Sequence, residues 1–186
     1  STDDVEIKSV AEKYKANVPF LRPSELSDDQ SSSSSALIHA VKFMETANSC
    51  KYDLIVELMC TNPLKNKLDI DLVIEKASKT NSESVIAVHK LDDHHPARIK
   101  KIVDDKIVDF CVEEPNEARR QDLRPKAFIR SGSIYCMKRN YLMEQNKRYG
   151  GGNSRPYILP TERAVNVDSE IDFLIAEFMI SKKDKA

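Results

Sequence analysis

The sequence predicts an α/β protein built on a mostly parallel β-sheet. Apolar runs of strand length, Asp53–Leu58 and Ser84–Val88, alternate with amphipathic runs of helix length, Ser31–Glu45 and Leu68–Ser78. Strands that alternate with helices favour right-handed crossovers between parallel strands. The alternation breaks in the middle of the chain, which predicts an antiparallel insertion in this sheet.

Two further helices are predicted from helical spacing of apolar residues, and they lie at Val5–Lys15 and Arg139–Asn146. Short apolar runs predict further strands, at Val18–Leu21, around Ala127–Ile129 and Ser133–Met137 as a pair, and at Tyr157–Leu159. The segments Arg98–Val103 and Lys106–Cys111 flank Asp104-Asp105 and are typical of a hairpin. An antiparallel excursion of this kind in an α/β sheet is often an oligomerisation arm.

Composition limits the classes of function. The chain has 186 residues, which suits one domain with an appendage, and its 29 basic and 30 acidic side chains leave a net charge of −1. This balance argues against nucleic-acid binding through bulk charge. No apolar run reaches membrane-spanning length and no signal-peptide pattern is present, so no membrane partner is expected. The four scattered cysteines form no CxxC motif, which favours a reduced, cytoplasmic protein.

The stretch from Asn166 to Asp172 holds the strongest candidate for chemistry. An apolar, strand-like run (Ala164, Val165, Val167) leads to Asp168, and Ser169 and Asp172 form a capping box at the start of a helix. Ligands bind at the carboxyl ends of strands in open α/β sheets, where a carboxylate beside an amide suits Mg²⁺ and a phosphate. The alternative is that Asp168 only caps or flanks the helix.

Two other segments place polar groups at helix starts. Arg22–Leu26 leads into the serine run Ser31–Ser35, which suits an anion or the polar edge of a nucleotide, or else is an ordinary N-cap. Thr61 and Asn62 follow a buried strand and precede a helix, so they either reach a ligand at the sheet edge or form a capped turn.

Basic residues lie on either side of the predicted hairpin, in His94–Arg98 and in Arg119-Arg120-Gln121. The planar donor fork of arginine suits a carboxylate or a phosphate. The alternative is that these residues form a solvated charged face.

The N-terminus lacks two features expected of a nucleotide-binding α/β domain. Ser1–Asp4 is typical of the end of a strand followed by a helix N-cap, yet no strand precedes it. Three of the four glycines are Gly150, Gly151 and Gly152, so no early glycine-bearing phosphate loop is present. We therefore expect that an N-terminal portion is missing from this chain.

Taken together, these segments resemble the acylneuraminate cytidylyltransferase family, the CMP-sialic acid synthetases, without its N-terminal phosphate loop. The matching segments occur in the family's order over nearly the whole chain: STDD, LRPSEL with the serine-rich helix start, LMCTNPLK, DHHPARIK, RRQDL, AFIRSGSIY and NVDSEIDF. The resemblance implies a Rossmann-like nucleotidyltransferase sheet with helices on both faces. It implies a nucleotidyltransferase domain formed by residues 1–92 and 127–186, and an inserted dimerisation arm at 93–126 that reaches the partner's active site in a homodimer.

The resemblance also implies a reaction and its residues. The anomeric hydroxyl of a nonulosonic acid would attack the α-phosphorus of CTP, with Mg²⁺ required, to give a CMP-sugar and pyrophosphate. Carried over by position, the site residues fall into four groups: Asp168 and Arg120 as catalytic residues; Arg22, Ser31 and Ser33 as nucleotide-binding residues; Arg98, Gln121, Ser131, Tyr135 and Thr61 as substrate-binding residues; and Asp168 with Asn166 as metal ligands.

Four departures from the family pattern qualify these expectations. Without the phosphate loop, this chain alone is expected to be inactive or severely impaired. Asn166 replaces a carboxylate that some members carry, which weakens the case for a second metal. Met59 replaces a common glutamine and Ser131 a common asparagine, so the particular sugar is left open. The alternatives are a cytidylyltransferase for another sugar acid, of the 3-deoxy-manno-octulosonate class, and a catalytically impaired dimerising module of the same fold.

Overall fold

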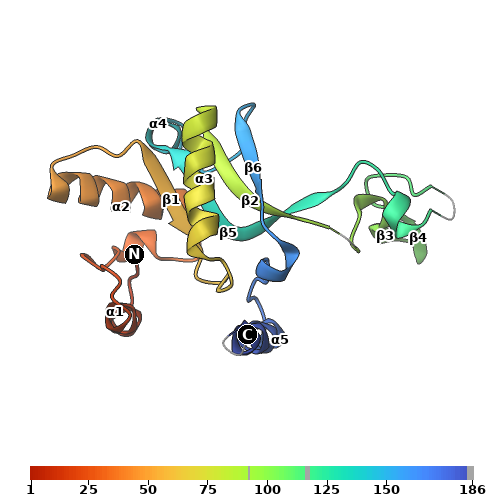
Figure 1. Ribbon diagram of the computed structural model, residues 1–186, viewed down its shortest axis with the longest axis horizontal. Helices are drawn as coiled ribbons and strands as arrows, with labels where there is room; N and C mark the ends of the chain where they lie inside the picture. The colour runs from red at the N-terminus through yellow and green to blue at the C-terminus, as the bar shows by residue number, and fades with distance from the viewer. Residues whose placement is uncertain (92, 116–117, 184–186) are drawn as a thin grey trace. The chain divides into compact units, whose positions relative to one another are not determined.

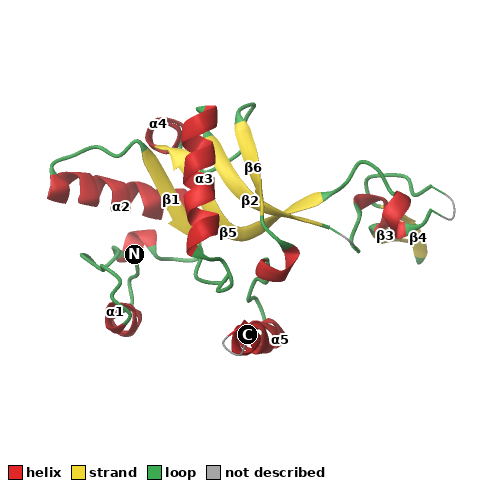
Figure 2. Cartoon of the chain, viewed as in Figure 1, coloured by secondary structure: helices red, strands yellow, loops and turns green. Residues whose placement is uncertain are grey.

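A computed structural model describes residues 1–91, 93–115 and 118–183 of the chain (Figure 1). Its helices are α1 (Val5–Lys13), α2 (Ser33–Asn48), α3 (Lys67–Thr80), α4 (Arg139–Gln145) and α5 (Glu170–Lys183). Its strands are β1 (Leu54–Leu58), β2 (Ser84–Lys90), β3 (Lys100–Val103), β4 (Lys106–Asp109), β5 (Phe128–Lys138) and β6 (Ser154–Ile158) (Figure 2). Short 3-10 helices occur at Ser24–Leu26, Pro96–Arg98, Arg120–Asp122 and Thr161–Arg163.

The main sheet has the strand order β1-β5-β2-β6. Backbone hydrogen bonds at the two ends of β5 pair it antiparallel with β1: Arg139 donates to the Asp53 carbonyl, and Met59 donates to the Ser133 carbonyl. The equivalent bonds make β5 antiparallel to β2 and β6 parallel to β2. Strands β1, β2 and β6 therefore run in one direction and β5 in the other, which makes the sheet mixed with one reversed strand.

The predicted hairpin is confirmed as a separate two-stranded sheet, in which β3 pairs antiparallel with β4 and Val103 lies opposite Lys106. Asp104 and Asp105 both adopt positive φ angles, of 48° and 61°. Two consecutive residues with positive φ are typical of the type I′ turn, whose twist matches that of the flanking strands. Aspartate tolerates this conformation better than most residues, so the Asp-Asp pair forms the turn without glycine.

The chain divides into two compact units. The first unit comprises Ser1–Glu57, Lys76–Val85 and Tyr135–Arg155, and its buried apolar side chains include Val41, Val85, Met137, Tyr141 and Leu142. The second unit comprises Leu58–Glu75, Ile86–Ile134 and Pro156–Ala186, and its buried apolar side chains include Leu64, Val73, Ala87, Ile134 and Leu159.

The observed strands differ from the predicted ones in three places. Val18–Leu21 is not a strand, because Pro19 interrupts it and Phe20 instead packs on His39 and Phe43 of α2. The expected pair at 127–129 and 133–137 is one continuous strand, β5, which passes through Gly132 at a φ of 66°.

The third difference concerns Ala164, Val165 and Val167, which form no strand. They follow the 3-10 helix at Thr161–Arg163. Their backbone groups bond to the loop after β1: the Val165 carbonyl accepts from Asn62, and the Val167 amide donates to Thr61. The apolar pattern is therefore explained by burial against a loop and not by a place in the sheet.

Inside the first unit, α2 and α4 are joined by an ion pair between Glu45 and Arg139. Arg139 donates to both carboxylate oxygens of Glu45, at 2.6 and 2.8 Å, and the Tyr52 amide donates to the same carboxylate at 3.2 Å. These hydrogen bonds, led by those of Arg139, lower the pKa of Glu45 from 4.5 to about 2. Two donors in a planar fork give this pair a defined geometry.

The depressed pKa of Glu45 predicts how stability depends on pH. A carboxylate with a lowered folded-state pKa contributes stability that is present above pH 4.5 and is lost as the pH falls through about 2. We expect Glu45→Gln to lower the free energy of unfolding at neutral pH, with the difference from wild type shrinking as the pH falls toward 2. Urea unfolding over this pH range measures the effect. Glu12→Gln, which removes a surface contact with Lys8 at 3.9 Å, is the matched control. A pH-independent difference for Glu45→Gln would contradict the assignment.

Candidate active site

The predicted metal ligand, Asp168, lies in the second unit immediately before α5. Its carboxylate is exposed and accepts a hydrogen bond from Nδ2 of Asn166 at 2.6 Å. Ser169 and Asp172 cap α5 reciprocally: the Ser169 hydroxyl oxygen accepts from the Asp172 amide at 3.4 Å, and Asp172 Oδ2 accepts from the Ser169 amide (2.9 Å), the Ser169 hydroxyl (2.7 Å) and the Asp168 amide (3.2 Å). The predicted capping box is therefore confirmed. Within the described part of the chain, the Asp168 carboxylate takes no part in capping, so its solvent-facing oxygens remain accessible to a ligand.

The loop after β1 is held against the loop that carries Asp168. Asn62, which is fully buried, donates from Nδ2 to the Val165 carbonyl at 2.8 Å. The Val167 amide donates to the Thr61 carbonyl at 2.7 Å. Two predicted site residues, Thr61 and Asp168, thus belong to loops that are directly bonded to each other. Asn62 does not cap the following helix, because its side chain ties the two loops together. The helix α3 begins at Lys67, and Asn66 caps it by accepting from the Asp69 amide at 3.0 Å.

Lys65 closes the loop after β1 from its other end. Its ammonium group donates to the carbonyls of Met59 and Asn62, both at 2.6 Å. Burial lowers the pKa of Lys65, and two carbonyl acceptors partly replace the water it has lost. This lysine therefore fixes the backbone of the loop that carries Thr61.

Ser131, a predicted substrate-binding residue, is buried within β5. Its hydroxyl donates to the Ala87 carbonyl at 3.1 Å and lies 2.5 Å from the Ser133 hydroxyl. The next residue, Gly132, faces the Asn166 amide: a Cβ at Gly132 would lie 3.5 Å from Asn166 Oδ1. Gly132, next to Ser131, thus contacts the loop that carries Asp168. The Ser131 hydroxyl itself forms hydrogen bonds within the sheet.

A groove of about 540 Å³ opens beside these loops. It is lined mainly by apolar atoms, from Cys60, Thr61, Pro63, Val167, Phe173, Ala176, Glu177, Ile180 and Ser181. Thr61 on one wall and Val167 on the other are joined through the backbone bond described above. Sequence reasoning missed this groove, although Phe173, Ala176 and Ile180 have the spacing of one helix face.

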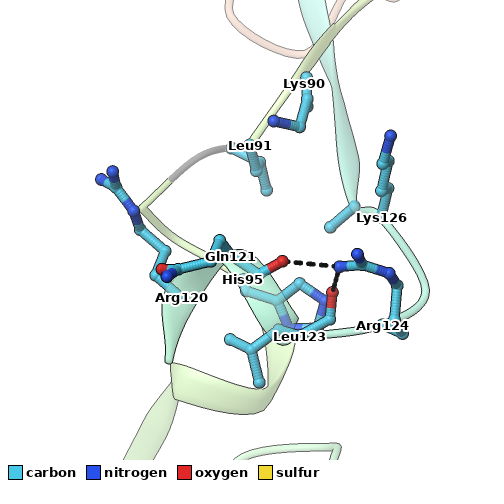
Figure 3. Close-up of a pocket in the computed structure, with 9 residues that line it drawn as sticks. Lys90, Leu91, His95, Arg120, Gln121, Leu123, Arg124 and Lys126 are labelled. Carbon is cyan, nitrogen blue, oxygen red and sulfur yellow. Dashed lines mark hydrogen bonds between the residues drawn. The ribbon is translucent and has the colours of Figure 1, made fainter. Parts of the chain in front are cut away.

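A second cavity, of about 290 Å³, lies at the base of the arm (Figure 3). Its wall is strongly cationic, and the lining residues are Lys90, Leu91, His95, Arg120, Gln121, Leu123, Arg124, Lys126 and Ala127. Arg120 and Gln121, two of the predicted site residues, both line this pocket, and their contact with a substrate stays a prediction. Clustered cations in a concave site favour an anionic ligand, because the potentials of the separate charges add within the cavity.

The wall of this cationic pocket is held by hydrogen bonds to backbone carbonyls. Arg124 donates to the carbonyls of Gln121 and Leu123, both at 2.8 Å (Figure 3). The buried His95 lies with Nε2 2.8 Å from the Pro125 carbonyl and accepts from the Ala97 amide at Nδ1, so Nε2 carries the proton. Of the two adjacent histidines, His95 is thus structural.

Arg98 lies next to this pocket but does not line it. Its guanidinium approaches Asp93 at 3.9 Å and Glu114 at 4.0 Å. Asp93 also pairs with Arg120, at 3.2 Å. These contacts are exposed and are therefore weak. Arg98 and Arg120 share one acidic partner, and an incoming anion would compete with it.

The cytidylyltransferase family profile matches residues 1–149. The chain belongs to the cytidylyltransferase family. This result, together with the fold, confirms the family resemblance that the ordered motifs indicated.

Several characterised proteins resemble this cytidylyltransferase over almost its full length. Post-translational flagellin modification protein B of Campylobacter coli is 30% identical over 184 residues, which cover 99% of this chain and 77% of that protein. CMP-N,N'-diacetyllegionaminic acid synthase of Campylobacter jejuni is 31% identical with the same coverage. Pseudaminic acid cytidylyltransferase of Campylobacter jejuni is 28% identical over 180 residues, 96% of this chain and 75% of that protein.

A solved structure, that of CMP:2-keto-3-deoxy-manno-octonic acid synthetase complexed with CTP, is similar with a TM-score of 0.62. The match covers 98% of this chain and 79% of that chain, at 13% sequence identity. At this identity the likeness establishes the fold alone. The predicted α/β nucleotidyltransferase fold with an inserted antiparallel pair is thereby confirmed.

The nucleotide-binding residues predicted for this cytidylyltransferase lie in the first unit. Arg22 donates to the Ser27 hydroxyl at 2.9 Å and to Asp3 at 3.0 Å. Ser31 donates to Asp28 at 2.8 Å, and this hydrogen bond lowers the pKa of Asp28. The N-cap of α2 is Ser32, not Ser31. Ser33 begins the helix with an exposed side chain, so Arg22, Ser31 and Ser33 remain predictions for the nucleotide.

Tyr135 also lies in the first unit, and its ring is almost fully covered. The Arg148 guanidinium lies over the ring at 4.7 Å from its centroid, and Tyr149 packs at 5.6 Å. Arg148 in turn donates to Glu57 at 2.8 Å. Burial raises the pKa of Glu57, although Arg148 opposes the shift. The sequence analysis did not predict this cluster. The signal for it was Glu57, an acid within the apolar strand DLIVEL, because a buried carboxylate requires a partner.

The family resemblance implies Mg²⁺, and the residues around Asp168 can be tested for fit. Among the described residues, no group of three His, Cys, Asp or Glu side chains could hold a metal ion. Mg²⁺ commonly binds through one or two carboxylates and completes its coordination with substrate phosphates and water. The exposed Asp168 carboxylate fits that mode. Asn166 presents Nδ2 to Asp168 and has a buried Oδ1 without a hydrogen-bond partner, so in this arrangement it orients the carboxylate.

The contact between the two loops predicts a stability effect at Asn62. Asn62→Ala removes the donor to the Val165 carbonyl in a fully buried position, which we expect to destabilise the protein by about 1–3 kcal/mol. Chemical denaturation measures this change. Asn48→Ala, which removes an exposed bond to the Tyr52 hydroxyl, is the matched control and should change stability by about 0.5 kcal/mol or less. Equal effects of the two substitutions would contradict the anchoring role of Asn62.

Proposed function

We propose that this protein activates a nonulosonic, sialic-type acid as its CMP-sugar. The anomeric hydroxyl oxygen forms a bond to the α-phosphorus of CTP, the bond from that phosphorus to the β-phosphate oxygen breaks, and pyrophosphate leaves. The hydroxyl proton passes to solvent or to a basic group. The support for the transfer reaction is membership of the cytidylyltransferase family. The support for the sugar class is the similarity to proteins named as legionaminic and pseudaminic acid enzymes.

One observation carries the assignment of the reaction centre. The Asp168 carboxylate is exposed, is oriented by Asn166 and is not used for capping. A Mg²⁺ ion bound there would neutralise the charge that builds on the α-phosphoryl group. Asp168 would then hold the ion, Asn166 would orient Asp168, and the bonded loops would keep Thr61 beside them.

The cationic pocket is the proposed recognition site for the carboxylate of the sugar acid. Arg120 and Gln121 line it together with Lys126 and Arg124. A planar guanidinium can bind a carboxylate through two parallel hydrogen bonds. We propose further that the arm mediates a homodimer and delivers Arg120 and Gln121 to the substrate of the partner subunit, in a cytoplasmic setting where CTP is available.

The role of Asp168 is tested by Asp168→Ala in the protein that contains this chain. Pyrophosphate release from CTP and a panel of nonulosonic acids is expected to fall about 100-fold or more, because a charge-stabilising contact in the transition state is lost. The thermal midpoint should change little, since the side chain is exposed. Glu170→Gln, at the neighbouring exposed position, should retain activity. Undiminished Mg²⁺-dependent turnover by Asp168→Ala would remove this residue from the site.

The role of the cationic pocket is tested by Arg120→Ala. Loss of a charged hydrogen bond of about 1.5–3 kcal/mol predicts a rise of roughly 10- to 150-fold in KM for the sugar acid, with little change in KM for CTP. The matched control is Arg119→Ala, because Arg119 is adjacent, pairs with Asp122 and does not line the pocket. If both substitutions raise KM equally, the effect is one of net charge and the pocket is not the recognition site.

A further inference from the structure

An ion pair with a fully buried carboxylate and a partly buried arginine lies next to the loop that carries Asp168. Asp69, fully buried in the first turn of α3, accepts from Arg163 at both carboxylate oxygens, at 2.7 and 3.0 Å. The Tyr157 hydroxyl donates to the same carboxylate at 2.9 Å, and the Asn66 amide at 2.9 Å. All the bonds that this carboxylate requires are therefore supplied by protein groups.

This ion pair is charged in the folded state. Burial alone would raise the pKa of Asp69, but the bonds from Arg163, Asn66 and Tyr157 outweigh it and lower the pKa. A buried ion pair loses hydration, and an apolar pair of the same shape is often as stable or more stable. The ion pair therefore contributes little to the free energy of unfolding. Its carboxylate nevertheless accepts four directional hydrogen bonds, which fix the position of Arg163 relative to Asp69.

Arg163 ends the 3-10 helix Thr161–Arg163 and begins the path to Asp168. The chain between them is fixed again at the Val165 carbonyl by Asn62, and at the Val167 amide by Thr61. The chain is therefore anchored at three successive residues, Arg163, Val165 and Val167. The residue that follows the last anchor is Asp168 itself. The anchoring groups belong to Asp69, in the first turn of α3, and to Thr61 and Asn62 in the loop after β1, and these three residues all lie in the second unit.

We propose that Asp69 and Arg163 are positioning residues for the reaction, and that their ion pair sets where the Asp168 carboxylate lies. The inference rests on the proposed role of Asp168 as the metal ligand. Neither residue touches the reacting atoms in this proposal; both act through the backbone from Arg163 to Asp168. A small displacement of a metal-binding carboxylate is enough to lower turnover strongly.

The test compares Arg163→Met with Arg163→Lys. Arg163→Met keeps the apolar stem and removes the charge, so we expect the Mg²⁺ concentration for half-maximal activity to rise about fivefold or more and kcat to fall. The KM for the sugar acid should stay within about twofold of wild type, because the cationic pocket is built from other residues. Arg163→Lys restores one charge without the planar fork and should rescue part of the loss.

Amide hydrogen exchange gives a readout that does not depend on activity. In Arg163→Met, the Val167 amide, which donates to Thr61, should exchange about tenfold faster or more relative to the core amides of β5. The matched control is Arg139→Met, which breaks another bidentate arginine–carboxylate pair, that with Glu45 in the first unit. It should lower stability without changing the Mg²⁺ dependence or the exchange of Val167.

The outcomes separate this inference from the proposed function. If Asp168→Ala is inactive but Arg163→Met leaves both the Mg²⁺ dependence and the Val167 exchange unchanged, the positioning role is wrong and the metal role stands. If Asp168→Ala retains activity, the metal role fails, and the positioning role fails with it. Should Arg163→Met not fold, Arg163→Lys and Asp69→Asn provide the same comparison. Loss of activity in the Arg139→Met control with the same Mg²⁺ shift would also overturn the inference.

Discussion

The candidate site depends on the way one irregular loop is held in place. Residues 164–168, which follow the 3-10 helix Thr161–Arg163, form neither helix nor strand, so no regular hydrogen-bond ladder fixes their backbone. Their position comes from tertiary contacts: the buried Asp69–Arg163 pair, the Asn62 side chain and the Val167–Thr61 backbone bond. Leaving a buried polar group unpaired costs free energy, so these contacts together favour one position of the loop. We expect the removal of one contact to leave its buried partner unsatisfied and to displace the loop.

In this arrangement some polar side chains hold the structure together, and others are left exposed to bind ligands. Asp172 and Ser169 satisfy the start of α5, which leaves the Asp168 carboxylate outside the capping network. The cationic pocket at the base of the arm gathers positive charge around a small cavity, and its wall is braced by Arg124 and by His95. A reaction between two anions, a nucleoside triphosphate and a sugar acid, requires separate sites of positive potential for the two substrates. In the proposed function, the metal ion binds the nucleoside triphosphate and the arm binds the sugar acid.

Local patterns in the sequence predicted the elements whose causes are local. The Asp104-Asp105 turn and the Ser169–Asp172 capping box both depend on residues within four positions of each other, and both are confirmed. The strand predicted at Val18–Leu21 was wrong because Phe20 packs onto α2 and Pro19 has no amide hydrogen to donate to a neighbouring strand. The apolar residues before Asp168 likewise pack against another loop. Pairs such as Asp69 with Arg163, or Glu57 with Arg148, are separated by more than ninety positions, so no local pattern could join them.

The most direct measurement is a crystal structure of the protein with CTP and Mn²⁺ in place of Mg²⁺, in which the anomalous signal locates the ion. The proposed role of Asp168 requires an ion bound directly to an Asp168 oxygen, at a distance of about 2.0–2.3 Å, with the triphosphate completing its coordination. An ion coordinated by other residues, with the Asp168 carboxylate turned to solvent or to a helix terminus, would contradict it.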